Sequence, residues 1–306
     1  MRLVFLGTAE FSVPSLRAVH AAGHDVAAVV TQPDRLGDRG RPAPRPVAEV
    51  AIELGVPILQ PARLRGPEAM AQVLALRPDA LVVAAYGQIL PASLLDAPPH
   101  GGINVHASLL PRWRGASPIS AAIRAGDDLT GVSIMRMDAG LDTGPVFATR
   151  STAITPDDTT PVLADRLARI GAELLVEVLA AIESGTAPPP RPQDDTAATL
   201  APRLTRADGE LDWETAPLEI DRALRALQPW PGTSVPLGGE RVRLLRGEPA
   251  IAAARPPAEP GTLLGVTGGS VLVACRGGAY RVDEVQAPGR KPMDAAAYLR
   301  GRRVAP

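Results

Sequence analysis

The chain has 306 residues, more than one hydrophobic core usually supports, and the sequence therefore predicts two domains. With 45% hydrophobic and 21% charged residues, it has the composition of a globular protein, and no apolar run approaches the roughly 20 residues that cross a bilayer. The single cysteine, Cys275, excludes an intrachain disulfide and a thiolate metal cluster, and a net charge of −1 excludes attraction of the whole chain to nucleic acid. These features predict a cytoplasmic protein without membrane contact, in which any RNA contact comes from local basic patches.

The first half of the chain alternates short apolar runs with helical patterns, which predicts a Rossmann-like, mostly parallel α/β sheet with helices on both faces. The run at residues 2–6 lacks the basic region and long apolar core of a signal peptide and is predicted as the first strand. Further strands are predicted at residues 26–31, 81–85, 102–107 and 131–137. Helices are predicted from Ser12 to just before Gly23, over residues 118–125 and over residues 160–183.

The composition changes after residue 187. Residues 188–205 are rich in proline and charge without apolar periodicity, which predicts an extended linker. Beyond it we expect a helix at residues 218–227 and then short strands, because pairs of glycines that accept the positive φ of hairpin turns follow at residues 238–239, 268–269 and 277–278. The predicted organisation is a first domain in residues 1–187, a linker in 188–205 and a small OB-like β-barrel in 206–306.

Two polar residues alternate at the end of the predicted strand 102–107. Asn104 and His106 project to the same face, and the carboxyl ends of strands are where open α/β sheets place their sites. A neutral donor beside a group that titrates near pH 7 suits an oxyanion that develops while a proton is moved. The alternative, which is common for an isolated histidine, is that His106 only stabilises the end of the strand.

A second polar segment follows the strand predicted at residues 131–137. Gly140 and Gly144 flank Asp142, where backbone could come close to a ligand, and a carboxylate there could orient an imidazole. The alternative is that Asp138 and Asp142 are turn residues that bond their own backbone.

Several mechanisms are excluded by missing motifs. The chain has no Gly-x-Ser-x-Gly elbow, no Walker loop and no His-Glu-x-x-His, and the turn at residues 7–12 lacks the later glycines of a dinucleotide fingerprint. The sequence therefore predicts direct group transfer, without a covalent intermediate and without a metal.

Taken together, these segments resemble the folate-dependent formyltransferases, in which Asn, His and Asp form the catalytic set. On that resemblance Asn104, His106 and Asp142 match the three catalytic residues. The similarity to members that act on initiator tRNA extends over essentially the whole chain. It is carried by residues 5–11 (FLGTAEF), 31–35 (TQPDR), 39–41 (RGR), 111–119 (PRWRGASPI), 131–144 (GVSIMRMDAGLDTG), 212–213 (DW) and 229–231 (PWP).

The resemblance implies a reaction and its partners. The expected donor is 10-formyltetrahydrofolate, and the expected acceptor is the amino group of methionine on the acceptor stem of initiator tRNA. A monomer is expected. Folate contacts are implied for Tyr86, Gly87, Ile89, Leu90, Ser108, Leu109, Leu110, Pro111, Asp138 and Gly140. Contacts to tRNA are expected from Arg35, Arg39, Arg41, Arg290 and Lys291.

Three other functions compete with this interpretation. A formyltransferase for an amino sugar or a purine precursor would need neither the second domain nor the basic loop around Arg39. A nicotinamide-dependent oxidoreductase predicts a complete glycine fingerprint and an acidic residue at the end of the second strand, where this chain has Val30-Thr31-Gln32. A non-catalytic RNA-binding module leaves the grouping of Asn104, His106 and Asp142 unexplained.

Overall fold

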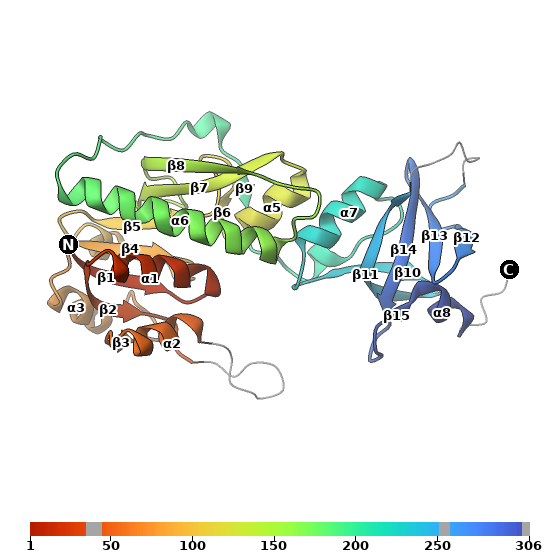
Figure 1. The fold of residues 1–306 in the computed structure, drawn as a ribbon, viewed down its shortest axis with the longest axis horizontal. Helices are drawn as coiled ribbons and strands as arrows, with labels where there is room; N and C mark the ends of the chain where they lie inside the picture. The colour runs from red at the N-terminus through yellow and green to blue at the C-terminus, as the bar shows by residue number, and fades with distance from the viewer. Residues whose placement is uncertain (35–44, 251–257, 302–306) are drawn as a thin grey trace. The chain divides into compact units, whose positions relative to one another are not determined.

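A computed structural model of the chain describes residues 1–34, 45–250 and 258–301. The chain folds into two compact units, which are described separately (Figure 1). The first contains residues 1–118, 129–153 and 163–201, and the second contains residues 119–128, 154–162 and the chain from 202 onward. No helix in the described part of the chain is both long and apolar enough to cross a membrane.

The first unit is built on a seven-stranded sheet with the order β3-β2-β1-β4-β5-β7-β8. The first five strands in this order run parallel, whereas β7 is antiparallel to both β5 and β8, so the predicted mostly parallel sheet is confirmed. The strands are β1 (Arg2–Gly7), β2 (Asp25–Val30), β3 (Ile58–Leu59), β4 (Ala80–Ala84), β5 (Gly102–His106), β7 (Leu129–Arg136) and β8 (Val146–Ala153).

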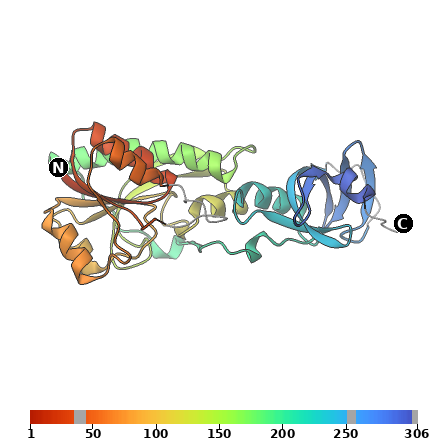
Figure 2. The same cartoon turned by 90° about the horizontal axis from the view of Figure 1, so that it is seen from below.

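Helices cover both faces of this sheet, as predicted. Figure 2 shows α3 on one face and α1, α2 and α6 on the other. A proline lies in the first turn of α1, α2 and α3, where its fixed φ suits a helix and its missing N–H leaves no bond unmade. The helices are α1 (Val13–Ala21), α2 (Pro46–Glu53), α3 (Pro67–Ala75), α4 (Ala92–Leu95) and α6 (Thr160–Glu183).

The central strands are buried on both faces. All five residues of β4 and all five of β5 are buried, which explains why β4 is a continuous apolar run rather than an alternating one. Helix α6 crosses the sheet closely at Gly171, where an added Cβ would lie 2.7 Å from Val105 Cγ1 and 3.3 Å from Val132 Cγ1. Val105 therefore faces α6, which leaves the opposite face of β5 for Asn104 and His106.

Several elements of this sheet region were not predicted, among them β8, α2 and α3. Strand β8 alternates half-buried and exposed residues and carries threonine and arginine, so it has no apolar run to mark it. Helices α2 and α3 span only eight and nine residues, which is too short for a helical period of apolar residues to be recognised in the sequence. Their existence depends on the sheet that they cover.

The second unit is an antiparallel sheet with two helices, α7 (Pro217–Ala226) and α8 (Ala295–Arg300), in addition to α5 (Pro118–Ala125). The order is β10-β11-β14-β13-β12, with β15 paired to β14. Its core includes Trp213, whose indole N–H donates to the Pro236 carbonyl at 2.6 Å. The strands are β10 (Thr233–Leu237), β11 (Glu240–Ala250), β12 (Leu263–Thr267), β13 (Ser270–Cys275), β14 (Gly278–Gln286) and β15 (Met293–Asp294).

The glycine pairs mark hairpins, as predicted. Gly238 and Gly239 have φ of +61° and +85° between β10 and β11, and the other two pairs lie at the β12–β13 and β13–β14 turns. Among the described residues no ladder joins β12 to β10, so the described part of the sheet is an open path of strands rather than a closed barrel.

Residues 191–201, called the strap below, pack against the first unit. Arg191 and Val146 exchange two backbone hydrogen bonds of 2.8 Å. Strand β9 (Leu200–Ala201) pairs in parallel with β6 (Arg114–Gly115). Gly115 has φ of +120°, and a Cβ there would lie 2.6 Å from the Ala201 carbonyl oxygen, so this close approach requires glycine. Most of the predicted linker is therefore bonded to the sheet region.

The contact at Gly171 predicts a loss of stability in Gly171→Leu. A leucine there would overpack the interface of α6 with β5 and β7, and we expect the free energy of unfolding to fall by about 1–3 kcal/mol. Ala180→Leu, at an exposed position of the same helix, is the matched control and should change it by less than about 0.5 kcal/mol. Chemical denaturation followed by circular dichroism measures both. Equal midpoints for the two variants would contradict this packing.

Candidate active site

Asn104 and His106 lie two residues apart on β5, on the face opposite α6. Both are buried, with 9% and 5% of their surface exposed. Within the described part of the chain, no hydrogen bond is formed by the Asn104 side chain. A largely buried amide that keeps its donors available is the group that an oxyanion site needs.

The imidazole of His106 has an acceptor on each side. Its Nε2 lies 3.0 Å from the carbonyl oxygen of Trp113, which can only accept, so Nε2 carries the hydrogen of this bond. Its Nδ1 lies 3.6 Å from Asp142 Oδ2, which is beyond ordinary hydrogen-bond distance. Nδ1 is therefore the ring nitrogen that can exchange a proton with a reacting group, with a carboxylate beside it.

Asp142 reaches this imidazole by an indirect path. Strand β7 is antiparallel to β5, and His106 pairs with Ser133 in the middle of β7, whereas Arg136 at the end of β7 pairs with Ile103. Residues 137–145, called the return loop below, therefore leave the sheet at the far end of β5 and must fold back toward His106. Asp142 adopts a φ of +53°, a left-handed conformation that costs a non-glycine residue roughly 1–2 kcal/mol.

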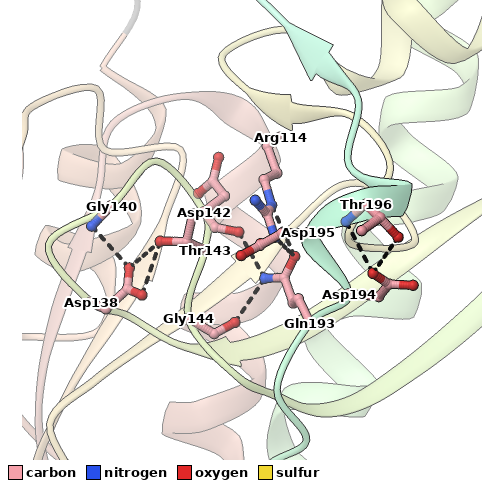
Figure 3. Close-up of polar contacts among 10 residues, drawn as sticks. All are labelled: Arg114, Asp138, Gly140, Asp142, Thr143, Gly144, Gln193, Asp194, Asp195 and Thr196. Carbon is pink, nitrogen blue, oxygen red and sulfur yellow. Dashed lines mark hydrogen bonds and ion pairs between the residues drawn. The ribbon is translucent and has the colours of Figure 1, made fainter.

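The carboxylate of Asp142 is held from outside its own turn. The backbone N–H of Gly115 donates to Asp142 Oδ2 at 2.8 Å. Asp138, by contrast, accepts from the Gly140 N–H at 3.0 Å and from the Thr143 hydroxyl at 2.7 Å (Figure 3). The turn-residue alternative therefore describes Asp138, whereas Asp142 bonds a different segment and lies beside His106.

The two glycines of the return loop serve packing within the protein. A Cβ at Gly144 would overlap the carbonyl oxygen of Arg136, and a Cβ at Gly140 would overlap the Thr143 hydroxyl. The sequence suggested an approach to a ligand at these positions. In the structure the atoms that come close to them belong to the loop itself and to β7.

Gln193 of the strap holds the return loop from its other side. Its Nε2 donates to the carbonyl oxygens of Asp142 and Gly144, both at 2.7 Å (Figure 3). Its Oε1 accepts from Arg114 Nε and Nη2 at 3.0 and 2.9 Å, and Arg114 Nη2 also forms an ion pair of 2.7 Å with Asp195. Neither Gln193 nor Arg114 was identified from the sequence, because a glutamine in a proline-rich stretch carries no pattern. The available signal for Arg114 was its place in the run 111–119 that carries the family resemblance.

The segment 86–90 presents little side chain to a ligand. Tyr86 and Leu90 are 2% and 6% exposed and belong to the apolar core, and burial raises the pKa of the Tyr86 phenol to about 12. The Tyr86 carbonyl accepts from Thr8 Oγ1 and Gln32 Nε2. A Cβ at Gly87 would lie 2.6 Å from Gln32 Nε2, and Ile89 is 90% exposed. In this segment, the atoms that remain available for the expected folate contacts are therefore those of the backbone and of the Ile89 side chain.

The segment 108–111 follows β5 directly. Ser108 is fully buried and its hydroxyl donates to the Arg112 carbonyl at 2.6 Å, while the Leu110 N–H donates to Ser133 Oγ at 3.0 Å. These bonds fix the backbone beside His106. Leu110 and Pro111 also line a cavity of about 380 Å³ with β8 and residues 188–194.

The residues expected to contact tRNA lie apart from this site in the chain. Arg290 and Lys291 are exposed in the turn between β14 and β15, and in the described chain no carboxylate forms an ion pair with either. Arg35, Arg39 and Arg41 lie outside the described residues. Among the described histidine, cysteine and acidic side chains, no group of three or more is placed to hold a metal ion.

Comparison with known families identifies the chain. The formyl transferase family matches residues 1–179, and the C-terminal domain of formyl transferases matches residues 203–303. The protein therefore belongs to the formyl transferase family. It is 50% identical over 307 residues to the methionyl-tRNA formyltransferase of Acidiphilium cryptum, covering 100% of this chain and 98% of the relative. It is 49% identical to the methionyl-tRNA formyltransferase of Xanthomonas campestris, covering 100% and 99%.

Solved structures share the fold at low sequence identity. A sugar 3N-formyltransferase, WlaRD, has a TM-score of 0.69 at 14% identity and covers 95% of this chain and 99% of its own. HypX from Aquifex aeolicus, solved in complex with tetrahydrofolic acid, has a TM-score of 0.65 at 18% identity and covers 98% of this chain and 47% of its own. These likenesses support the α/β architecture followed by a separate β unit.

The amide of Asn104, which bonds no residue in the described part of the chain, predicts a large catalytic role. Asn104→Ala should lower kcat for formyl transfer by about 10²–10³-fold, since one donor to a developing oxyanion contributes this much. The KM for the donor should change little, and the melting temperature should stay near that of the wild type because the amide bonds no described residue. Steady-state kinetics with a thermal melt measure these quantities. A wild-type kcat in the variant would refute the assignment.

Proposed function

We propose that this protein transfers the formyl group of 10-formyltetrahydrofolate to the α-amino group of methionine carried by initiator tRNA. The observation that supports the proposal best is the grouping of Asn104, His106 and Asp142. It lies in a chain that is half identical, over its whole length, to a methionyl-tRNA formyltransferase. The folate donor and the charged tRNA are both substrates.

Asn104 is the proposed donor to the formyl oxygen. The reaction joins the amine nitrogen to the formyl carbon and breaks the bond from that carbon to the folate nitrogen. Negative charge develops on the oxygen between these two events. The amide of Asn104 is fixed by its strand and largely removed from water, so it can donate at once without reorganising.

His106 and Asp142 are the proposed proton-handling pair. One proton must leave the attacking amine and one must reach the departing folate nitrogen. Nδ1 of His106 can take and return a proton, because Nε2 is already committed to the Trp113 carbonyl. The carboxylate of Asp142, 3.6 Å from Nδ1, faces the positive charge that the imidazole carries in between.

The remaining proposed contacts divide between the two parts of the chain. Residues 1–187 would carry the chemistry, with the donor held along 86–90, 108–111 and the return loop near Asp138 and Gly140. Residues 206–306 would contact the RNA through Arg290 and Lys291, joined to the first part by 188–205. The match of residues 203–303 to a formyl transferase C-terminal domain supports this division. We also infer that the protein acts in the cytoplasm as a monomer.

The test is a transfer assay with two acceptors. The protein is incubated with 10-formyltetrahydrofolate and either methionyl initiator tRNA or a nucleotide-linked amino sugar. We expect formylmethionyl-tRNA, resolved from the uncharged and unformylated tRNA on an acid gel, and no formylated sugar. Formylation of the sugar with no transfer to tRNA would overturn the proposal in favour of a small-acceptor enzyme.

Arg290→Ala combined with Lys291→Ala should weaken use of the tRNA alone. If both contact phosphates, kcat/KM for tRNA should fall, and its logarithm should depend less steeply on log salt, by about 1 for each lost contact. Donor KM should not change. Arg276→Ala is the matched control, since its guanidinium is exposed but already paired with Glu219 at 3.1 Å. Identical salt slopes for the double variant and the wild type would show that the β14–β15 turn is not a tRNA contact.

A further inference from the structure

We propose that Gln193, in the strap, is a positioning residue for the His106–Asp142 pair. The proposal rests on the proposed function and adds to it a part of the chain that carries no catalytic group. Among the described residues, the Gln193 side chain bonds Arg114 and the return loop, and not His106. It acts through the backbone of the return loop, which it holds at Asp142 and Gly144.

The orientation of the Gln193 amide is fixed by its partners. Nε2 faces two carbonyl oxygens, which can only accept, and Oε1 faces the guanidinium of Arg114, which can only donate. The reversed amide would place an oxygen against both carbonyls. The two N–H groups thus clamp the loop on both sides of Thr143, directly where Asp142 adopts its positive φ.

Arg114 closes this arrangement into a ring of contacts. It is 6% exposed, and its guanidinium bonds both Gln193 and Asp195 of the strap (Figure 3). The next residue, Gly115, donates its N–H to the carboxylate of Asp142. Asp142 is therefore held at two points. Gln193 bonds its carbonyl oxygen, and Gly115, which follows Arg114 in the chain, bonds its carboxylate.

The strap also holds the second acceptor of His106. Thr199 accepts the Trp113 N–H on its Oγ1 at 2.9 Å and the Arg114 N–H on its carbonyl at 2.9 Å. Trp113 in turn presents its carbonyl oxygen to His106 Nε2. Both groups that flank the imidazole, from two separate loops, are thus tied to residues 191–201. This common attachment is the main support for a positioning role of the strap.

Gln193→Glu is the sharpest variant. It keeps the size of the side chain and an acceptor for Arg114, but it replaces the two donors by an oxygen that faces two carbonyls. We expect kcat to fall about 10–100-fold, because small displacements of a positioned group have effects of this size. The KM for tRNA should change less than about threefold, since the bonds of Gln193 go to Arg114 and the return loop and not to Arg290 or Lys291. Thr196→Ala is the matched control, because Thr196 is an exposed strap residue whose side chain bonds only Asp194 among the described residues. The kcat of this variant should equal that of the wild type.

A double-mutant cycle separates positioning from general destabilisation. If Gln193 acts through Asp142, Gln193→Glu should lower kcat no further in an Asp142→Ala background. An equal loss in both backgrounds would overturn the proposal, as would a wild-type kcat for Gln193→Glu. If Gln193→Glu does not fold, Gln193→Leu replaces it. It removes both donors to the return loop, and its effect on kcat should likewise vanish in the Asp142→Ala background.

Failure of the proposed function is recognised separately. The wild-type chain in the same assay tests the function, and the ratio of variant to wild type tests the role of Gln193. If the wild type transfers formyl to neither acceptor, the proposed function fails, and the ¹⁵N shifts of the His106 ring decide the positioning role. A shift that differs between wild type and Gln193→Glu but not Thr196→Ala supports it, and identical shifts in all three proteins overturn it.

Discussion

The active-site geometry depends on the return of residues 137–145 across the sheet. His106 ends β5, while β7 runs antiparallel to β5 and delivers the chain to the far end of that strand. A loop that simply turned from β7 into β8 would leave Asp142 remote from the imidazole. The carboxylate reaches His106 Nδ1 at 3.6 Å because Gly115 and Gln193 bond the loop in its folded-back form, with Asp142 left-handed.

This constraint explains where glycine and arginine are placed. Because Gly144 has no Cβ, the return loop can pack closely against the carbonyl oxygen of Arg136. Gly115 in the same way allows the strap to pack against β6, where Thr199 bonds Trp113. Arg114 is buried, and a buried guanidinium is tolerated only with several acceptors. Gln193 Oε1 and Asp195 supply them, which makes the strap a structural requirement of the arginine as well as a support for the loop.

The sequence predicted the parts of the site that obey local periodicity. Alternation along β5 placed Asn104 and His106 on one face, and the bounds of α5 and α6 agree with their apolar patterns. The motif 131–144 identified Asp142 only through resemblance, because nothing in a loop sequence shows that it folds back. The role of Gln193 could not be predicted from the sequence for the same reason. Its role comes from contacts 51 and 49 residues away in the chain, and a proline-rich composition indicates a spacer until those contacts are seen.

The same limits apply to the fold. Glycine pairs predict hairpins because the turn itself requires positive φ, and those three turns are present. Whether the hairpins close into a barrel depends on pairing between distant strands, which no local signal encodes, and in the described residues the ladder from β12 to β10 is not formed. Edge strand β8 was missed because half of its surface faces away from the core and carries polar residues.

The protonation state of the His106 ring shows directly whether the imidazole is held between the Trp113 carbonyl and the Asp142 carboxylate. Two-dimensional ¹H–¹⁵N spectra of the four histidines, with His106 assigned by its loss in His106→Gln, report which ring nitrogen is protonated. At a pH where the ring is neutral, we expect the proton to reside on Nε2 and Nδ1 to be unprotonated beside Asp142. A ring protonated on Nδ1, or one that averages between the two tautomers, would contradict this geometry.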